Sequence, residues 1–282
     1  MKYVKLNNGV QMPILGLGTF KVSDPDQGVE AIRDAIKVGY RLIDTAQIYG
    51  NEKIVGKAVK ESGVPRSELF ITTKVRIGDA TYEKTKAAFE VSLNNLMLDY
   101  VDLYLIHHPF NDYYGAWRAM CELYNGGKIR AIGVSNFYPA RLIDFIMNNQ
   151  VMPAVNQVEL HPFYQQTKLH ELLAKYAIQP EAWGPFSQGS KELLSNETLN
   201  NIGRKYGKTT AQVTLRWLIQ RGIAVIPKSV NPERIRENFA VFDFELSHED
   251  MMSIAMLDTD KGTTHTDPAF AENIISKHSI KS

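Results

Sequence analysis

A repeat constrains this chain more than any other feature: short apolar runs rich in β-branched residues return at intervals of 23 to 31 residues over most of the sequence. Each interval has the length of one strand and one crossover helix. Eight strands that alternate with helices predict an α/β fold, a single (β/α)8 TIM barrel, and a doubly wound parallel sheet is the alternative. The runs begin near Ile14, Leu42, Phe70, Val101, Ala131, Ala154, Ile178 and Ala224.

Extra helices are expected late in the chain. The last interval spans 46 residues, which is too long for one helix, and its pattern predicts two, over 192–206 and 210–220. Ser247 and Asp250 match a capping box that opens a final helix over 251–257. The tail, 258–282, shows no clear period, and the sequence assigns it no structure.

The chain opens on a predicted hairpin. Asn8-Gly9 lies between two short apolar segments, 4–6 and 10–12, and Asn-Gly accepts the positive φ angles that a two-residue hairpin loop requires. We expect this hairpin to close one end of the barrel. No low-complexity segment or linker interrupts the sequence, so residues 1–282 are expected to form a single domain.

Charge and cysteine content argue against several classes of protein. The 32 basic and 31 acidic residues occur in mixed order and leave a net charge of +1, which argues against nucleic-acid or anionic-membrane partners. The only cysteine, Cys121, excludes an intramolecular disulfide. No apolar run could span a bilayer or act as a signal peptide, so we expect a cytoplasmic protein without a membrane partner. The sequence predicts no metal site.

Polar residues stand at the ends of three successive runs: Asp44, Lys74 and His107. Because the carboxyl ends of barrel strands meet at one mouth, these side chains are expected to converge, together with Tyr49 from the loop after Asp44. Singly, each has a structural alternative, as a turn cap, a strand-end lysine or a histidine satisfied by its neighbours. The four together predict an acid–base site.

The chemistry of this group favours reduction of a carbonyl. A lysine ammonium stabilises a phenolate and lowers the phenol pKa from about 10, while an aspartate keeps the lysine charged. Tyr49 would then protonate a carbonyl oxygen that His107 orients. No nucleophile is evident nearby, so a hydride from a nicotinamide is the expected partner. The alternative is a Schiff-base aldolase, which would require Lys74 to be neutral.

A nicotinamide cofactor is expected at the barrel mouth rather than on a dinucleotide-binding loop. Gly16 and Gly18 begin the usual fingerprint, but Lys21 takes the place of its third glycine and no helix follows. Ser135 and Asn136 close the fifth run and Gln157 lies in the sixth. Their hydroxyl and amide groups suit the carboxamide of a nicotinamide.

Two further segments suit other parts of the cofactor. Trp183 ends the seventh run and could stack on the nicotinamide ring, with a place in the core as the alternative. After the eighth run, Lys228, Ser229 and Arg234 surround a helix start at Pro232. This set suits a 2′-phosphate and favours NADP over NAD, and its alternative is a solvated, charged helix start.

These residues and their surroundings resemble the aldo-keto reductase superfamily, and most of all its bacterial 2,5-diketo-gluconate reductase-like and glyoxal/methylglyoxal reductase-like members. The resemblance implies a (β/α)8 barrel that uses NADPH to reduce small aldehydes, ketones or keto-sugars to alcohols, as a monomer. A non-catalytic, NADPH-binding sensor or regulatory barrel is the alternative. The resemblance extends from about Val4 to Leu257 and rests on segments 16–19, 44–46, 49–52, 105–107, 127–137 and 226–230.

The resemblance also implies roles for individual residues: Tyr49 as proton donor, Lys74 and Asp44 as its tuning pair, and His107 as the group that orients the substrate. The implied substrate contacts are Phe20, Tyr49, Arg76, His107 and His108. The implied cofactor contacts are Gly18, Thr19, Phe20, Ser135, Asn136, Gln157, Trp183, Gly184, Pro185, Phe186, Gln188, Lys228, Ser229, Val230, Arg234, Glu237 and Asn238, the last two near the adenine.

The sequence departs from the superfamily at two positions. Members often carry Trp two residues after the catalytic lysine and a bulky aromatic residue directly after the catalytic histidine, where this chain has Arg76 and His108. In an extended strand Arg76 would share a face with Lys74 and make the pocket more polar, which favours small or anionic carbonyl substrates. The alternative is a solvated arginine that points outward.

Overall fold

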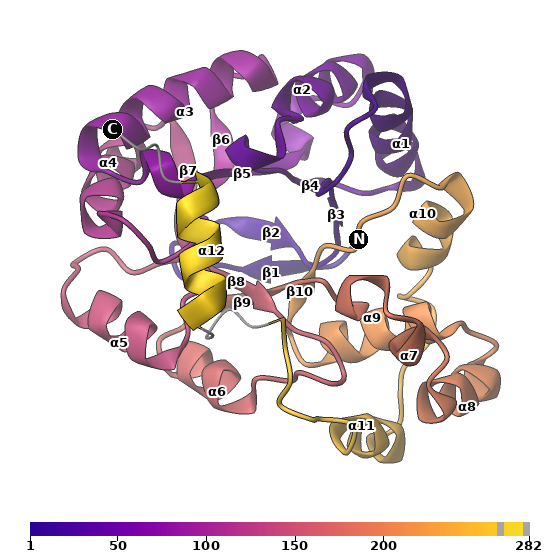
Figure 1. Cartoon of the computed structure of the whole chain (residues 1–282). Coiled ribbons are helices and arrows are strands. Elements are labelled where there is room, and N and C mark those ends of the chain that lie inside the picture. Colours follow the sequence, from indigo (N-terminus) through magenta and orange to yellow (C-terminus); the bar gives the residue numbers. More distant parts are fainter. Residues whose placement is uncertain (264–267, 279–282) are drawn as a thin grey trace.

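The computed structural model describes residues 1–263 and 268–278. Eight parallel strands pair in the order in which they occur in the chain, and isolated bridges join Leu15 to Val225 and Gly18 to Lys228, which closes the ring. The predicted (β/α)8 barrel is confirmed, and the doubly wound sheet is wrong (Figure 1). The barrel strands are β3 Gly16–Gly18, β4 Leu42–Asp44, β5 Phe70–Val75, β6 Val101–Ile106, β7 Ile129–Ser135, β8 Val155–Glu159, β9 Gln179–Trp183 and β10 Ala224–Val225.

Helices surround the barrel and bury their apolar sides against it (Figure 1). Within the described ranges no helix is long and apolar enough to cross a membrane. The α-helices are α1 Pro25–Val38, α2 Glu52–Glu61, α3 Tyr82–Leu96, α4 Tyr113–Asn125, α5 Pro139–Met147, α6 Thr167–Lys175, α7 Lys191–Leu194, α8 Glu197–Tyr206, α9 Thr210–Gln220, α10 Pro232–Phe239, α11 His248–Ala255 and α12 Pro268–His278. The short 3₁₀ helices are η1 Gln47–Tyr49, η2 Arg66–Glu68, η3 Ile77–Asp79 and η4 Ser187–Gly189.

The expected N-terminal hairpin is present, formed by β1 (Tyr3–Lys5) and β2 (Gln11–Pro13). Asparagines of its loop donate to backbone carbonyls near the starts of β7 and β8, so the hairpin closes that end of the barrel. The predicted two-residue loop is wrong. Gly9 N–H donates to Leu6 O at 2.9 Å, which makes a three-residue loop with a positive φ of 89° at Gly9 alone.

Two predicted helices have different boundaries in the structure, and one helix was not predicted. The helix expected over 192–206 is two helices, α7 and α8, because the side chain of Asn196 accepts a hydrogen bond from Leu199 N–H and caps a new helix. The capping box of Ser247 and Asp250 is confirmed, but α11 begins at His248, directly after Ser247, and not at residue 251. The tail, which has no clear pattern, contains α12, and this helix lies across the front of the barrel (Figure 1).

Closure of the barrel depends on a close approach at Gly18. Its N–H donates to Pro227 O at 3.1 Å, and a Cβ atom at this position would lie 2.7 Å from Ile226 O. Real Cβ atoms do not approach a backbone oxygen so closely, so a larger residue would separate β3 from the segment after β10. The glycine therefore keeps the mouth of the barrel in shape, and it also lines the cavity there.

Candidate active site

Asp44 and Lys74 form a buried ion pair at the mouth of the barrel. The Lys74 Nζ donates to Asp44 Oδ1 at 2.6 Å and to Thr45 O at 2.9 Å. The two side chains are 2% and 0% exposed, so neither charge has water to stabilise it. Because β4 and β5 are neighbours in parallel register, an acid at the end of one lies within reach of a lysine near the end of the other.

The loop after β4 presents Tyr49 to this pair. The 3₁₀ helix η1 follows β4 closely and stops at Gly50, which adopts a left-handed conformation with a φ of 68°. Buried Asn51 then ties the loop down, since its side chain accepts from Thr45 Oγ1 at 2.7 Å and donates to Thr19 O at 2.8 Å. The ring of Tyr49 consequently lies over the Lys74 ammonium, with its centroid 5.1 Å from Nζ.

His107 lies on the other side of the tyrosine. It follows β6 directly, and its ring meets that of Tyr49 edge-on with centroids 5.6 Å apart. The side-chain amide of Asn136 donates to His107 O at 2.9 Å and accepts from Trp183 Nε1 at 3.0 Å. Two residues expected at the cofactor thus also hold the histidine loop in place.

The charges of this group shift the pKa values of their neighbours in the expected directions, but at Tyr49 the effect of burial is larger than that of the Lys74 charge. Burial raises the pKa of the Tyr49 phenol above its usual value, and the Lys74 charge only opposes this rise. Burial lowers the pKa of Lys74, but the charges of Asp44 and Tyr49 act the other way and leave it raised. Lys74 is therefore held charged, which does not favour the aldolase alternative.

Glu181, a residue that was not predicted from the sequence, is fully buried in β9 beside these groups. One amide group of Gln157 donates to Asp44 Oδ2 at 2.9 Å and to Glu181 Oε2 at 2.8 Å. Burial, with the nearby charge of Asp44, raises the pKa of Glu181 to about 8. A charged residue in the middle of a predicted barrel strand is the signal that could have identified it.

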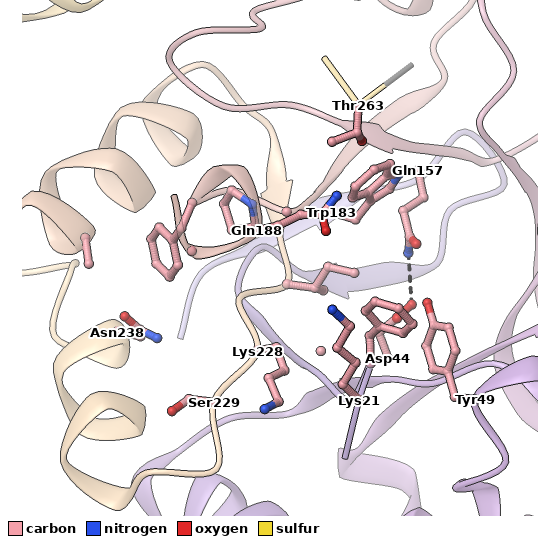
Figure 2. A pocket seen from close by; sticks show the side chains of 18 of the residues that line it. Lys21, Asp44, Tyr49, Gln157, Trp183, Gln188, Lys228, Ser229, Asn238 and Thr263 are labelled. Carbon is pink, nitrogen blue, oxygen red and sulfur yellow. Dashed lines mark hydrogen bonds between the residues drawn. The ribbon is translucent and has the colours of Figure 1, made fainter. Parts of the chain in front are cut away.

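The mouth of the barrel holds a cavity of about 1070 Å³, large enough for a dinucleotide and a small substrate. Figure 2 shows Asp44 and Tyr49 at one end and Ser229 and Asn238 at the other. The lining includes these predicted residues: Gly18, Phe20, Asp44, Tyr49, His107, His108, Ser135, Asn136, Gln157, Trp183, Gly184, Pro185, Phe186, Gln188, Lys228, Ser229, Arg234, Glu237 and Asn238.

Four predicted residues are not part of the lining. Lys74 lies behind Asp44, with no exposed surface. Thr19 is buried and donates through Oγ1 to Asp44 O at 2.9 Å, and Val230 packs against the core. Arg76 is the fourth: its Nε donates to Asp79 Oδ2 at 2.8 Å, so its charge is already paired. A contact of Arg76 with substrate stays a prediction, and it would have to form beside this ion pair with Asp79.

The far end of the cavity carries cationic side chains. Lys228 and Arg234 are exposed there, and within residues 1–263 and 268–278 neither forms an ion pair. The side chain of Asn231 caps α10 by accepting from Arg234 N–H at 3.0 Å, as the sequence predicts. This end of the cavity therefore offers charge and a helix start to an anion.

The C-terminal segment adds residues to the lining that the sequence did not indicate. Phe270 and Ile274 of α12 and Thr263 before it line the cavity. Thr263 is held by buried Glu159, whose Oε2 accepts from both its N–H and its hydroxyl group at 2.6 Å. The spacing of Phe270 and Ile274, four residues apart after a proline, is the signal that could have indicated a helix with one apolar side.

Known proteins share this sequence and architecture. Glyoxal reductase from Bacillus subtilis (strain 168) is 53% identical over 259 residues, which cover 92% of this chain and 93% of that protein. Methylglyoxal reductase DkgA from Escherichia coli (strain K12) is 46% identical over 261 residues, which cover 92% and 94%. The crystal structure of Bombyx mori aldo-keto reductase AKR2E4 in complex with NADP superposes with a TM-score of 0.89 at 33% identity and covers 96% of this chain and 97% of that one.

The resemblance inferred from the motifs is confirmed, both for the superfamily and for its glyoxal and methylglyoxal reductases. The profile of the aldo/keto reductase family matches residues 14–259, a range that begins just before the first barrel strand and ends after α11. The chain belongs to the aldo/keto reductase family.

Proposed function

We propose that this protein uses NADPH to reduce small aldehydes and ketones to alcohols, with Tyr49 as the proton donor. The observation that carries the proposal is the position of the Lys74 ammonium, 2.6 Å from Asp44 Oδ1 and 5.1 Å from the centroid of the Tyr49 ring. Burial of a charged lysine costs folding free energy, so its place against a phenol points to function. There the ammonium stabilises a phenolate.

Each polar residue has a part in the proton transfer. Tyr49 gives its phenolic proton to the carbonyl oxygen, and the resulting phenolate is stabilised by Lys74. Asp44 keeps Lys74 charged in a dry site where the ammonium would otherwise lose its proton. His107 lies beside the phenol and orients the carbonyl oxygen toward it. NADPH, when bound, supplies the hydride that the carbonyl carbon receives.

The residues around the cavity fit a phosphorylated nicotinamide cofactor. The amide oxygen of Gln157 accepts no hydrogen bond within the described part of the chain and is available to a carboxamide N–H, whereas its nitrogen is occupied. Lys228 and Arg234 offer two charges to a 2′-phosphate, and Ser229, whose hydroxyl group bonds to the backbone of Asn231, lines the same end of the cavity. Trp183, which lines the cavity beside Asn136, would pack on the nicotinamide.

The catalytic end of the cavity suits a small carbonyl compound. It is lined by the rings of Phe20, His108 and Phe270 and by the aliphatic side chain of Ile274, while the polar groups converge on Tyr49. Apolar walls with a few oriented polar groups are typical of small-molecule sites. Since the most similar relatives reported above are named for glyoxal and methylglyoxal, these two dicarbonyls are the first substrates to test.

The direct test is to mix the purified protein with NADPH and either dicarbonyl and to follow the loss of the reduced-nicotinamide absorbance. We expect oxidation of NADPH that depends on the dicarbonyl and yields the hydroxy-carbonyl product. A panel of keto acids and keto-sugars, assayed in the same way, ranks the substrate classes. Tight binding of NADPH without turnover of any compound would instead support a sensor or regulatory role.

Replacing Arg234 with alanine should weaken NADPH binding by about 10- to 150-fold, because a charge-assisted contact with a phosphate contributes about 1.5–3 kcal/mol. NADH lacks the 2′-phosphate, so its affinity should change little. Titration of the cofactor against protein fluorescence measures both dissociation constants. Arg236→Ala is the matched control, since Arg236 is exposed on the same helix and does not line the cavity. Equal losses for NADPH and NADH in Arg234→Ala would contradict a 2′-phosphate site.

A further inference from the structure

Glu181 is a buried acid that the proton transfer described above does not use. Its side chain has no exposed surface, and within the described residues its Oε1 atom has no hydrogen-bond partner. An isolated carboxylate in such a place is strongly unfavourable, so its presence requires an explanation beyond packing.

The Gln157 amide connects Glu181 to the catalytic group. Gln157 and Glu181 are paired residues on neighbouring strands β8 and β9, and their side chains meet in the barrel at 2.8 Å. The same amide nitrogen donates to Asp44 Oδ2 at 2.9 Å, across the barrel on β4. Figure 2 shows this bond between Gln157 and Asp44, next to Tyr49. One amide group thus bridges two carboxyl groups, each of which is fully or almost fully buried.

This cluster contains two acids and one cation. The Lys74 ammonium donates to Asp44 Oδ1 at 2.6 Å and to the backbone oxygen of Thr45 at 2.9 Å, and within the described residues it donates no hydrogen bond to Glu181. A second negative charge would therefore lie unpaired in a dry site beside the first. The cluster avoids this cost when Asp44 is ionised and Glu181 carries a proton.

We propose that Glu181 is a positioning residue for the reduction: through Gln157 it holds Asp44 in place, and its own charge state sets the pH above which Tyr49 no longer carries its proton. This inference rests on the proposed function, because it assumes that Tyr49 is the proton donor. Within the described residues Glu181 forms no hydrogen bond with the phenol or the ammonium, so it acts in two ways: its charge acts on both groups through space, and its contact with Gln157 helps to hold Asp44.

The titration of the neighbouring groups agrees with this arrangement. Burial first, and then the charge of Asp44, raises the pKa of Glu181 to about 8, whereas Lys74 and Gln157 act to lower it. Burial also raises the pKa of Asp44, but the charge of Lys74 and the hydrogen bonds that Asp44 accepts from Lys74 and Gln157 oppose this rise. On its other side Glu181 pairs with Ala224, which is not titratable. Once ionised, Glu181 raises the pKa of Tyr49 and of Lys74.

The charge on Glu181 determines the direction in which Glu181→Gln should shift the pH profile. Above about pH 8 Glu181 is ionised in the wild type, and its negative charge keeps the proton on Tyr49 to higher pH. Glu181→Gln removes that charge and retains an oxygen that can accept from Gln157. We therefore expect the alkaline limb of the kcat/KM profile for methylglyoxal reduction to move to lower pH by about one unit in Glu181→Gln, a tenfold loss on that limb. Near pH 6, where Glu181 is protonated, the two proteins should have equal activity.

Titration of the tyrosinate absorbance provides a readout that needs no turnover. The difference between the titrations of the wild type and of Tyr49→Phe isolates the ionisation of Tyr49. The same difference in a Glu181→Gln background should show the pKa of Tyr49 lowered by about one unit. Glu52→Gln is the matched control, because Glu52 is another buried carboxyl group that accepts from Thr73 and Asn95, does not contact Gln157 and does not line the cavity. Its alkaline limb should coincide with that of the wild type.

The results separate this inference from the proposed function. If the wild type does not turn over any carbonyl compound, the proposed function fails; if Tyr49→Phe retains the reductase activity, Tyr49 is not the proton donor and the inference about Glu181 fails with it. If Tyr49→Phe is inactive but the alkaline limb and the Tyr49 titration of Glu181→Gln both coincide with those of the wild type, only the role of Glu181 is wrong. A volume-matched variant, Glu181→Met, tests the bridge itself: loss of the acceptor for Gln157 should lower kcat at every pH without raising KM.

Discussion

Tyr49→Phe is expected to lower kcat for carbonyl reduction by about 10²- to 10⁴-fold, the usual contribution of a positioned general acid. The substitution removes one oxygen atom and leaves the ring in contact with Phe20 and His107, whose centroids lie 5.1 and 5.6 Å away. The loop that presents this ring is held by Asn51 and Gly50 rather than by the hydroxyl group, so fold and loop should persist. The comparison to make is kcat with glyoxal or methylglyoxal, alongside the NADPH dissociation constant.

The NADPH affinity should stay within about twofold, since the phenol hydroxyl is at the reacting end and not among the cationic side chains. Tyr82→Phe is a suitable control, because Tyr82 is bonded to Glu122 on the outer helices and lies away from the cavity. It should have wild-type activity. Residual turnover of Tyr49→Phe within about tenfold of the wild type would show that another group donates the proton.

Lys74→Met should be the second most damaging change, with kcat lowered by about 10²-fold or more. Without the ammonium, the phenolate that forms as Tyr49 gives up its proton has no counter-charge in a site already poor in water. Methionine has a volume close to that of lysine and fills the same space behind Asp44, so packing is retained. The loss should appear in kcat and in kcat/KM to a similar extent, because the interaction is made in the transition state.

The same variant should lose stability in a pH-dependent way. Removing one partner of a buried ion pair costs about 3–5 kcal/mol when the other remains charged. In Lys74→Met, Asp44 can escape this cost by binding a proton, which raises its pKa in the folded state above that in the unfolded state. The folded protein then holds a proton that the unfolded chain releases, so the free energy of unfolding falls as the pH rises through that window.

Urea denaturation at about pH 5 and about pH 8 checks this prediction, since the stability gap between the wild type and Lys74→Met should be larger at the higher pH. Lys86→Met is the matched control. Its ammonium pairs with Glu122 at 2.9 Å on the surface, where both side chains are more than 40% exposed, and its removal should change stability little at either pH. A gap for Lys74→Met that does not depend on pH would mean that Asp44 stays ionised.

The arrangement of the catalytic group was predictable because it depends on topology more than on side-chain detail. Parallel barrel strands place their carboxyl ends at one mouth, so polar residues that close successive runs converge whatever the exact register. Asp44 and Lys74 are neighbours because β4 and β5 pair in sequence order. Tyr49 follows within a single short helix that ends at a glycine in a left-handed conformation, which is also a local signal.

Other features required the folded structure. Arg76 shares a strand direction with Lys74, but the chain turns into η3 directly after β5 and brings Asp79 within 2.8 Å, so the guanidinium pairs locally. The helix α12 lies in a segment without a clear apolar period. The spacing of Phe270 and Ile274 is compatible with a helix that has one apolar side, but only the folded structure shows that this side packs at the barrel mouth.

The alternation of strands and helices and the identity of the polar groups at the barrel mouth could be read from the sequence, because both follow from local periodicity and from chain order. Only the tertiary structure decided which side chains meet across the barrel. Gln157 contacts Asp44 over a separation of 113 residues and Glu181 on the adjacent strand, and Thr263 reaches Glu159 over 104 residues. Such contacts depend on barrel closure and on side-chain direction inside it, and no local pattern in the sequence encodes either.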